Sequence, residues 1–366
     1  MEAIAPIQTR LKLLFGKDEK DVSQDVGADL LSFSYDDKET AEADEVRLTL
    51  KDPDGKWADT WKPDGGEVIR ASITAGTVLI GMQTLPCGKF FVDSFRTSGS
   101  PRVMEIKAVS IPLNKPIRKR LKTRAWEKTT LKQIAETIAK EAEATLLWDS
   151  EDNPTFDRQD QKKESDLKFL SRLCEENGLS IKLTDDQIVI FSQESYEKKA
   201  AVATYILGTS DIMRWDFEQE QSETYKSVTV SYRNPRQKKR GSAGSHRTRR
   251  STGKTVAKQA NPAVNSYTYT DPSADENGQE YQLKKRASSI DDAKRLAKAK
   301  LRQLNMRRVK GSMTVIGNPS LVAGVVISCQ GFGSFDGSFI CENVTHAVSG
   351  SGYTTQLRLR RVNNEY

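Results

Sequence analysis

The sequence lacks the residue patterns on which most metal centres and nucleophilic active sites depend. It contains only two histidines, and its four cysteines (Cys87, Cys174, Cys329 and Cys341) form no CxxC pair. Neither an HExxH motif nor a GxSxG motif is present. We therefore expect no metal, no cofactor and no catalytic residue, and we interpret the cysteines as buried free thiols.

Long apolar segments are missing as well. No stretch approaches the roughly 20 apolar residues that a membrane-spanning helix requires, and the N-terminal residues do not resemble a signal peptide. We expect no membrane span and synthesis in the cytoplasm. Residues 331–337 (GFGSFDG) are rich in glycine, but they open no helix and lack a Walker lysine, so we interpret them as a hairpin turn.

Positive charge is concentrated in one segment. The formal net charge is +7, yet residues 233–254 alone carry nine lysines and arginines and no acidic residue. The basic loop that we single out contains Arg236, Lys238, Lys239, Arg240, Arg247, Arg249 and Arg250. Such a loop could neutralise nucleic-acid phosphates, but no aromatic residue is interleaved for base stacking. A loop that orders against an acidic protein, or one that stays solvated, fits the same residues.

Two parts of the chain share an alternation of apolar and polar residues. Four pairs of segments occur in the same order: 29–35 with 211–217, 46–50 with 228–232, 75–80 with 323–327, and 88–93 with 337–342. The offset is 182 residues in the first two pairs (29 to 211) and close to 248 in the last two. This pattern predicts a duplicated β unit whose second copy contains an insertion.

The chain is long enough for two or three domains. Short alternating runs between turn signals predict a mainly β fold with an α+β middle domain. We expect two antiparallel β domains, each a small barrel or sandwich, at 1–112 and 199–366. The second should contain an insertion at about 233–310, made of the mobile basic loop and a helix at about 290–306.

The middle segment, residues 113–198, is predicted to be a small α/β domain. Thr130 and Gln133 have the spacing of a capping box, which predicts a helix at about 130–142. A second helix is predicted at about 165–177, followed by a β hairpin at 179–191.

Three motifs in this chain resemble the phage late control gene D family. Residues 160–178 contain ESDLKFLSRLCEENG, residues 317–324 read GNPSLVAG, and GFG at 331–333 is followed by His346 and by GYTT at 352–355. Their order and spacing are similar to those of the family from about residue 120 onward. The first hundred residues resemble it mainly in pattern.

The resemblance implies a structural role without enzymatic activity. Members of that family are similar to baseplate hubs of contractile phage tails and to the N-terminal part of type VI secretion spike proteins. A homotrimer with two tube-like domains per chain would form a ring of six around a channel, between the sixfold tail tube protein and the threefold central spike protein. Baseplate wedge or tape-measure proteins are further expected partners, and no small-molecule substrate is expected.

The same resemblance places the chain in the tail baseplate of a virion, or of a related injection particle, assembled in the cytoplasm of a bacterial host. Because the chain ends soon after its last predicted strand, we expect the spike to be a separate protein. The candidate assembly residues, taken from the polar positions of the alternating strands, are Arg47, Thr49, Thr229, Ser231 and Arg358.

Two other functions stay open at this point. The basic loop would suit a nucleic-acid-binding regulator. A cell-wall hydrolase would need a pair of carboxylates, and the chain has 50 acidic residues, among which no pair stands out.

Overall fold

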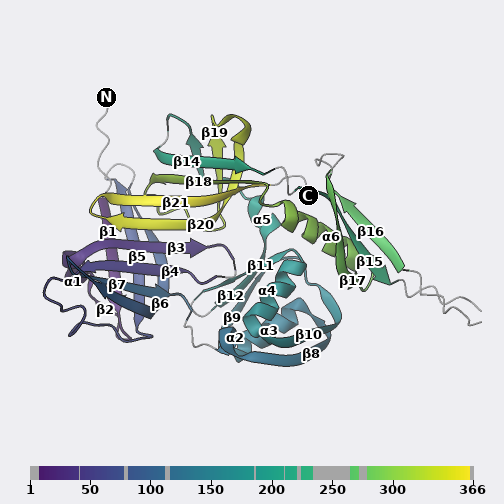
Figure 1. Ribbon diagram of the computed structural model, residues 1–366, viewed down its shortest axis with the longest axis horizontal. Helices are drawn as coiled ribbons and strands as arrows, with labels where there is room; N and C mark the ends of the chain where they lie inside the picture. The colour runs from purple at the N-terminus through teal and green to yellow at the C-terminus, as the bar shows by residue number, and fades with distance from the viewer. Residues whose placement is uncertain are drawn as a thin grey trace, which may run out of the picture. The chain divides into compact units, whose positions relative to one another are not determined.

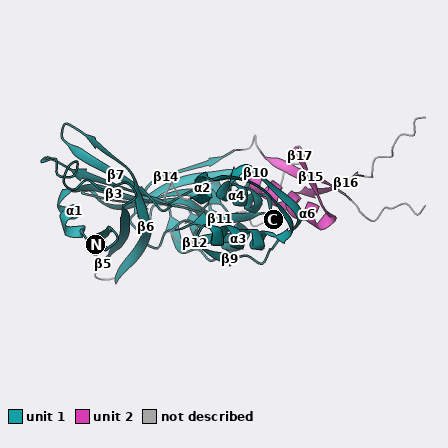
Figure 2. Ribbon diagram, turned by 90° about the horizontal axis from the view of Figure 1, so that it is seen from below, with its two compact units in different colours: residues 1–222, 306–364 teal, residues 223–305, 365–366 magenta. Residues whose placement is uncertain are grey.

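The computed structural model describes most of the chain. The described residues are 8–40, 42–77, 81–111, 116–184, 187–209, 211–220, 224–233, 264–271 and 278–362. The basic loop, whose chosen residues lie at 236–250, is outside them. The chain divides into two compact units, residues 1–222 with 306–364 and residues 223–305 with 365–366 (Figure 2). We call the second of these the insert unit.

The first part of the larger unit, which we call the first repeat, is an antiparallel sheet. Its elements are β1 (Gln8–Phe15), β2 (Lys20–Asp21), α1 (Ser23–Asp29), β3 (Leu30–Lys38), β4 (Glu45–Lys51), β5 (Val68–Thr77), β6 (Gly81–Ser98) and β7 (Val103–Val109). Its strands are hydrogen-bonded in the order β2–β1–β5–β6–β7–β4–β3 (Figure 1). Alternation buries one face completely at Phe33, Val46, Leu48 and Ile106, and each such side chain stabilises the fold by about 1.5–3 kcal/mol.

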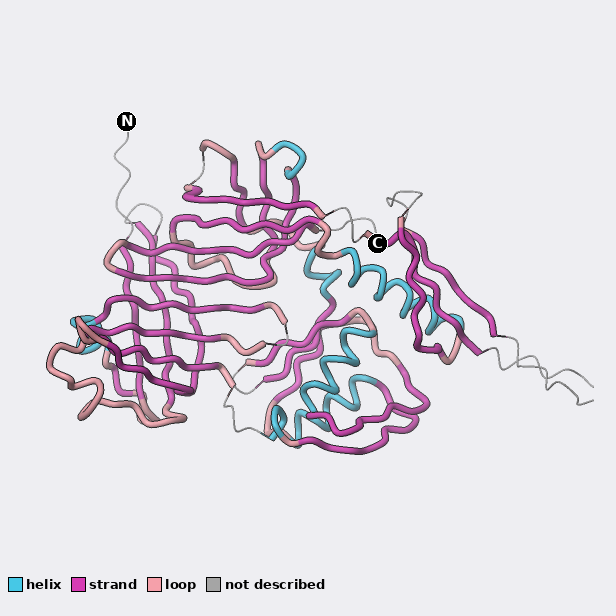
Figure 3. Tube along the Cα trace, in the orientation of Figure 1, coloured by secondary structure: helices cyan, strands magenta, loops and turns pink. Residues whose placement is uncertain are grey.

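The middle region contains most of the helix in the larger unit (Figure 3). Its elements are α2 (Pro116–Lys119), β8 (Leu121–Thr130), α3 (Leu131–Glu141), β9 (Thr145–Asp149), β10 (Thr155–Ser165), α4 (Asp166–Glu176), β11 (Leu179–Leu183), β12 (Gln187–Ser192) and α5 (Gln193–Glu197). At the start of α3, the Thr130 hydroxyl accepts from the Gln133 N–H (3.2 Å) and the Gln133 side chain accepts from the Thr130 N–H (3.0 Å). This is the capping box that the sequence predicts. The helices share a core that includes Ile134, Ile138 and Leu170.

The second repeat lies in the same unit. Its elements are β13 (Ala203–Ile206), β14 (Ile212–Gln219), β18 (Val309–Ile316), β19 (Val326–Gln330), the 3-10 turn η1 (Gly333–Phe335), β20 (Gly337–Ser349) and β21 (Gly352–Arg361). β14, β18, β21 and β20 follow one another in the sheet, β19 pairs with the start of β20, and β13 pairs with β19. The fold is therefore mainly β, as the sequence predicts.

The two repeats have the same strand order. The first reads β3–β4–β7–β6–β5–β1, and the second reads β14–β18–β21–β20–β19–β13. The edge strand is the one departure within this order, because β1 runs antiparallel to β5 whereas β13 runs parallel to β19. A shared order of this length supports a duplication of the sheet.

Irregularities of the backbone recur at equivalent places in the two repeats. Register shifts occur between Leu30 and Ser32 in β3–β4, between Ile212 and Arg214 in β14–β18, between Val92 and Ser94 in β6–β7, and between Cys341 and Asn343 in β20–β21. The first two are 182 residues apart (30 to 212), which is the offset that the sequence predicts, and the last two are 249 apart (92 to 341). Because such bulges persist within families, two coincidences of position are strong evidence of common origin.

A glycine with positive φ precedes both β5 and its counterpart β19, and its position corrects one predicted pairing. Gly66 and Gly324 have φ of 84° and 86°, a conformation that favours glycine. The Gly66 N–H donates to the Val92 carbonyl and the Gly324 N–H to the Cys341 carbonyl, both at 2.8 Å. The predicted pairing of 75–80 with 323–327 is therefore wrong, since the start of β5, not its end, corresponds to β19.

The predicted pairing of 46–50 with 228–232 is also wrong. The structural counterpart of β4 is β18, whereas residues 228–232 belong to β15 in the insert unit. The insert unit consists of β15 (Tyr225–Arg233), β16 (Val264–Thr270), β17 (Gln279–Ala287) and α6 (Ile290–Asn305). In it, β15 lies between β16 and β17 and packs against α6 through Val228 and Val230. Alternation identifies a strand but not its partner, so the insertion was predicted to begin after β15 although it begins before it.

Candidate assembly interface

One pair of strands joins the two repeats into a continuous sheet. Residues 32–38 of β3 run antiparallel to residues 343–349 of β20, with Lys38 opposite Asn343 and Ser32 opposite Ser349. Figure 1 shows the two strands side by side. The way in which one repeat associates with another is therefore visible within a single chain.

Asp37 holds three segments together beside this junction. Its buried carboxylate accepts from the Ala323 N–H at 2.8 Å and from the Lys182 ammonium on β11. The same ammonium lies 3.6 Å from the Asp44 carboxylate. Burial opposes the charge of Lys182, but Asp37 and Asp44 raise its pKa. Burial raises the pKa of Asp44 to about 6, against the lowering effect of Lys182.

His346 on β20 is a structural residue of the junction. It is fully buried, and its ring stacks on Tyr35 of β3 with centroids 6.0 Å apart. Its Nε2 lies 2.9 Å from the Leu321 carbonyl oxygen, which can only accept, so Nε2 carries the proton; Nδ1 accepts from the Tyr353 hydroxyl at 2.7 Å. Burial lowers the pKa of His346 to about 4, which keeps the imidazole neutral near pH 7.

Arg360 on β21 connects the second repeat to the middle region. Its guanidinium is 1% exposed and contacts Glu197 of α5, Glu39 at 3.5 Å and Glu342 at 3.3 Å. Although burial opposes its charge, Glu39 and Glu197 raise the pKa of Arg360. The sequence pattern does not reveal this cluster, because an arginine at the end of an alternating strand gives no sign that a helix far away in the sequence covers it. Removing one partner of such a buried cluster strongly lowers the free energy of unfolding, because it leaves a buried charge without its counter-charge.

One face of the continuous sheet is mostly polar between β6 and β14. One row of neighbouring residues runs through Ser94, Lys107, Arg47, Ser34, Ala347 and Thr354. Another runs through Lys38, Asn343, Arg358, Ser312 and Asp216. Side chains on this face alternate with the buried ones beneath it. The sheet therefore presents a polar surface that crosses from one repeat to the other.

The candidate assembly residues fall into two groups. Arg47 and Thr49 on β4 and Arg358 on β21 lie on the polar face, where Arg47 is paired with Glu45. Lys107, beside Arg47, lies 2.7 Å from the same Glu45 carboxylate.

The other two candidates belong to the insert unit. Thr229 and Ser231 lie on β15, and the Thr229 hydroxyl is 2.7 Å from that of Thr268 on β16. They share no sheet with the first group in the described part of the chain. They were grouped with it because β15 was predicted to be the counterpart of β4.

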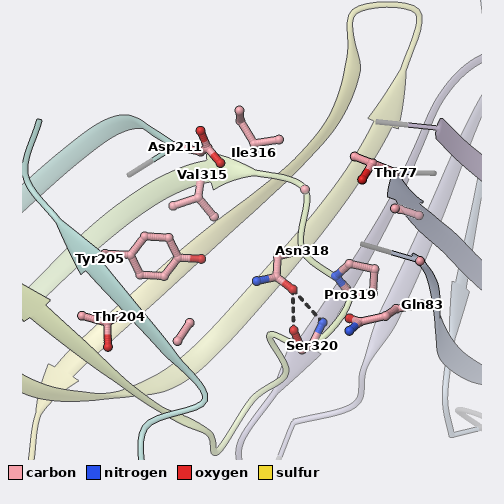
Figure 4. Close-up of a pocket in the computed structure, with 15 residues that line it drawn as sticks. Thr77, Gln83, Thr204, Tyr205, Asp211, Val315, Ile316, Asn318, Pro319 and Ser320 are labelled. Carbon is pink, nitrogen blue, oxygen red and sulfur yellow. Dashed lines mark hydrogen bonds between the residues drawn. The ribbon is translucent and has the colours of Figure 1, made fainter. Parts of the chain in front are cut away.

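A pocket of about 440 Å³ lies where the β5–β6 hairpin approaches the strand ends of the second repeat (Figure 4). The Asn318 side-chain oxygen accepts from the Ser320 N–H at 3.0 Å and from its hydroxyl at 2.5 Å, which shapes the loop at its edge. Asp211 is the one carboxylate among the described residues that line it. Glycoside hydrolysis uses a pair, which this lining does not offer.

Metal-ligand clusters of three or more histidine, cysteine, aspartate or glutamate side chains are absent from the described residues. The four cysteines are buried and unpaired, and burial raises the pKa of Cys174 to about 12. None of the helices in the described part of the chain is long and apolar enough to span a membrane.

Comparison with known proteins gives a consistent result. Residues 111–352 match the family described as "Phage tail baseplate hub (GPD)". A probable baseplate hub protein of Escherichia phage 186 is 26% identical over 365 residues, which covers 93% of this chain and 90% of that protein. The family match gives no support to the hydrolase or nucleic-acid alternatives.

Solved structures show the same fold at low identity. The 43 kDa tail protein of prophage MuSo2 from Shewanella oneidensis has a TM-score of 0.68 at 12% identity, with 97% of this chain and 98% of that chain covered. The E. coli c3393 protein, a component of the type VI secretion system, has a TM-score of 0.56 at 13% identity, with 92% and 75% covered.

Proposed function

The chain belongs to the phage tail baseplate hub (GPD) family and is a structural protein of the tail baseplate, and from this premise we propose that three copies form a ring of six β repeats. The ring would adapt the sixfold tail tube protein to the threefold central spike protein. Its role would be geometric, with no catalytic step.

The repetition of one sheet within the chain carries this proposal. The two repeats share their strand order and two bulges, and a strand pair already joins them edge to edge. A closed ring of three chains then presents six similar units, because each chain contributes two. Closure also satisfies strand edges that would otherwise be open to aggregation.

The polar face is the surface that we assign to the channel. It crosses the junction between repeats, so it would form a continuous lining once the ring closes. Arg47, Thr49 and Arg358 would lie on that lining. The middle region and the insert unit would then be available to meet baseplate wedge or tape-measure proteins.

Mass photometry of the full chain, alone and with the spike protein, tests the proposal. We expect a species of three times 40.9 kDa for the hub. A monomer at every concentration, alone and with the spike protein, would overturn it.

A further inference from the structure

Each chain carries both halves of a second strand junction, and neither half has a strand partner in the part of the chain that the structure describes. β14 is the equivalent of β3, and β6 is the equivalent of β20, the two strands that join the repeats internally. Within the described residues, β14 pairs only with β18, and residues 94–98 of β6 pair only with β7. Among the described residues, the outer edge of β14 and the edge of β6 at residues 94–98 are therefore open, and these are the edges that correspond to the internal junction.

Apolar side chains on these edges are exposed where their equivalents are buried. Phe95 on β6 is 40% exposed, whereas Val344, its equivalent on β20, is 0% exposed. Trp215 on β14 is 44% exposed, whereas Phe33, its equivalent on β3, is 0% exposed. All five residues at 94–98 are exposed. Large apolar side chains along an open strand edge mark a surface that a partner covers.

Six strands separate the two open edges, so the edges do not pair with each other within one chain. Between β6 and β14 the sheet contains β7, β4, β3, β20, β21 and β18 in hydrogen-bonded order. The two edges therefore lie at opposite sides of this stretch of sheet. One corresponds to the β3 half of the internal junction and the other to the β20 half, so the β14 edge of one copy can pair with the β6 edge of the next in a head-to-tail contact. A head-to-tail contact that closes generates a ring.

We propose that β14 of one copy pairs antiparallel with residues 95–98 of β6 in the next copy, in the register of the internal junction. Transferring that register by the offsets of 182 and 249 residues places Arg96 opposite Glu218 and Ser98 opposite Asp216. Cross-strand neighbours of opposite charge stabilise a sheet. The internal equivalents of Arg96 and Glu218 are Thr345 and Asp36, which are themselves hydrogen-bonded across the junction.

The proposed register also keeps the two faces of the sheet separate. Arg96 and Glu218 lie on the polar face, next to Glu105 and Lys310 on the neighbouring strands. On the opposite face Thr97 lies opposite Phe217, and Phe95 is the diagonal neighbour of Phe217. The polar lining and the apolar layer are both continued across the boundary between copies.

This inference rests on the proposed ring, and paired cysteines test it. The full-length variant Ser98→Cys/Asp216→Cys is oxidised in the assembled state, with the spike protein present, and separated on a non-reducing gel. We expect covalently linked species of two and three chains that a reductant removes, because cross-strand partners satisfy disulfide geometry. The matched control is Ser98→Cys/Gln219→Cys, which places the second thiol on the opposite face and should not cross-link.

Two measurements distinguish a failure of the proposed strand pairing from a failure of the proposed ring. Mass photometry of the unmodified chain is run in parallel. Trimers without a cross-link in Ser98→Cys/Asp216→Cys, or with equal cross-linking in the control, would overturn the register and leave the ring standing. A monomer under every condition would overturn both.

Charge reversal gives an independent measurement. Arg96→Glu and Glu218→Arg are each expected to weaken trimer formation by about tenfold, because like charges then face one another. The double variant should recover most of the loss, although Lys310 lies 3.4 Å from Glu218 and opposes full recovery. Lys168→Glu, on the exposed face of α4, is the control and should not change assembly. Additive losses in the double variant would overturn the pairing.

Discussion

Acidification should weaken the junction between the repeats through His346. The folded-state pKa of about 4 lies below the ordinary value of 6.5. Between these two pH values the unfolded chain binds more protons at this position than the folded chain does. The free energy of unfolding therefore falls as pH is lowered from 6.5 towards 4, and the loss is complete below the folded-state pKa.

The size of the effect follows from the pKa difference. One pKa unit corresponds to about 1.4 kcal/mol, so the shift from 6.5 to about 4 predicts a loss of about 3 kcal/mol at this one site. Asp44 acts in the opposite direction, because its pKa of about 6 makes the folded state the better proton binder between pH 3.8 and 6. The contribution of His346 is therefore measured against a variant that keeps Asp44.

His346→Gln is that variant. The glutamine amide can donate to the Leu321 carbonyl and its oxygen can accept from the Tyr353 hydroxyl, so both hydrogen bonds can be retained while the titrating group is removed. Amide hydrogen exchange in β20 reports the local opening free energy. From pH 7 to pH 4.5 the wild type should lose more of this free energy than the variant does, by about 2 kcal/mol, because the loss is not yet complete at pH 4.5.

Two results would refute this reasoning. Equal losses of opening free energy in wild type and His346→Gln would show that the imidazole does not couple to the junction. An NMR titration that gives His346 a pKa at or above 6.5 would show that burial does not control its charge.

Three further substitutions test other parts of the structure. Lys182→Met leaves Asp37 and Asp44 buried without their cation and should lower the free energy of unfolding by about 3–5 kcal/mol, measured by urea denaturation; adding Asp44→Asn should recover part of the loss. Ile138→Ala empties part of the core of the middle region and should cost about 2–5 kcal/mol in the same assay. Thr130→Ala removes the N-cap of α3 and should cost about 1 kcal/mol. A loss from Thr130→Ala as large as that from Ile138→Ala would contradict the smaller contribution that we expect from the cap.

Local signals in the sequence predicted local structure well. The spacing of Thr130 and Gln133 predicts the start of α3, where both capping hydrogen bonds are present. The similarity of 29–35 to 211–217 identifies β3 and β14 as equivalents, because both strands begin at the same bulge and alternate in the same phase.

The alternation of apolar and polar residues did not predict which strands pair when they lie far apart in the sequence. Residues 228–232 alternate as 46–50 do, but they pair within the insert unit, because alternation records which face is buried and not which strand lies beside it. For the same reason the sequence did not predict the Arg360 cluster, because its partner Glu197 lies on α5, far from Arg360 in the sequence.

The candidate interface was predictable only in part. The polar positions of β4 and β21 follow from alternation, which places Arg47, Thr49 and Arg358 on the polar face, and their part in assembly stays a prediction. The open edges were not, because Phe95 and Trp215 resemble core residues in the sequence and only the sheet order shows that nothing in the described chain pairs with those edges.

Cryo-electron microscopy of the hub bound to its spike would show whether one duplicated sheet turns three chains into a ring of six units. We expect six β repeats around a channel, with β3 beside β20 within each chain and β14 beside β6 between chains. A ring in which the two repeats of a chain occupy unlike positions, or in which β14 faces solvent, would contradict it.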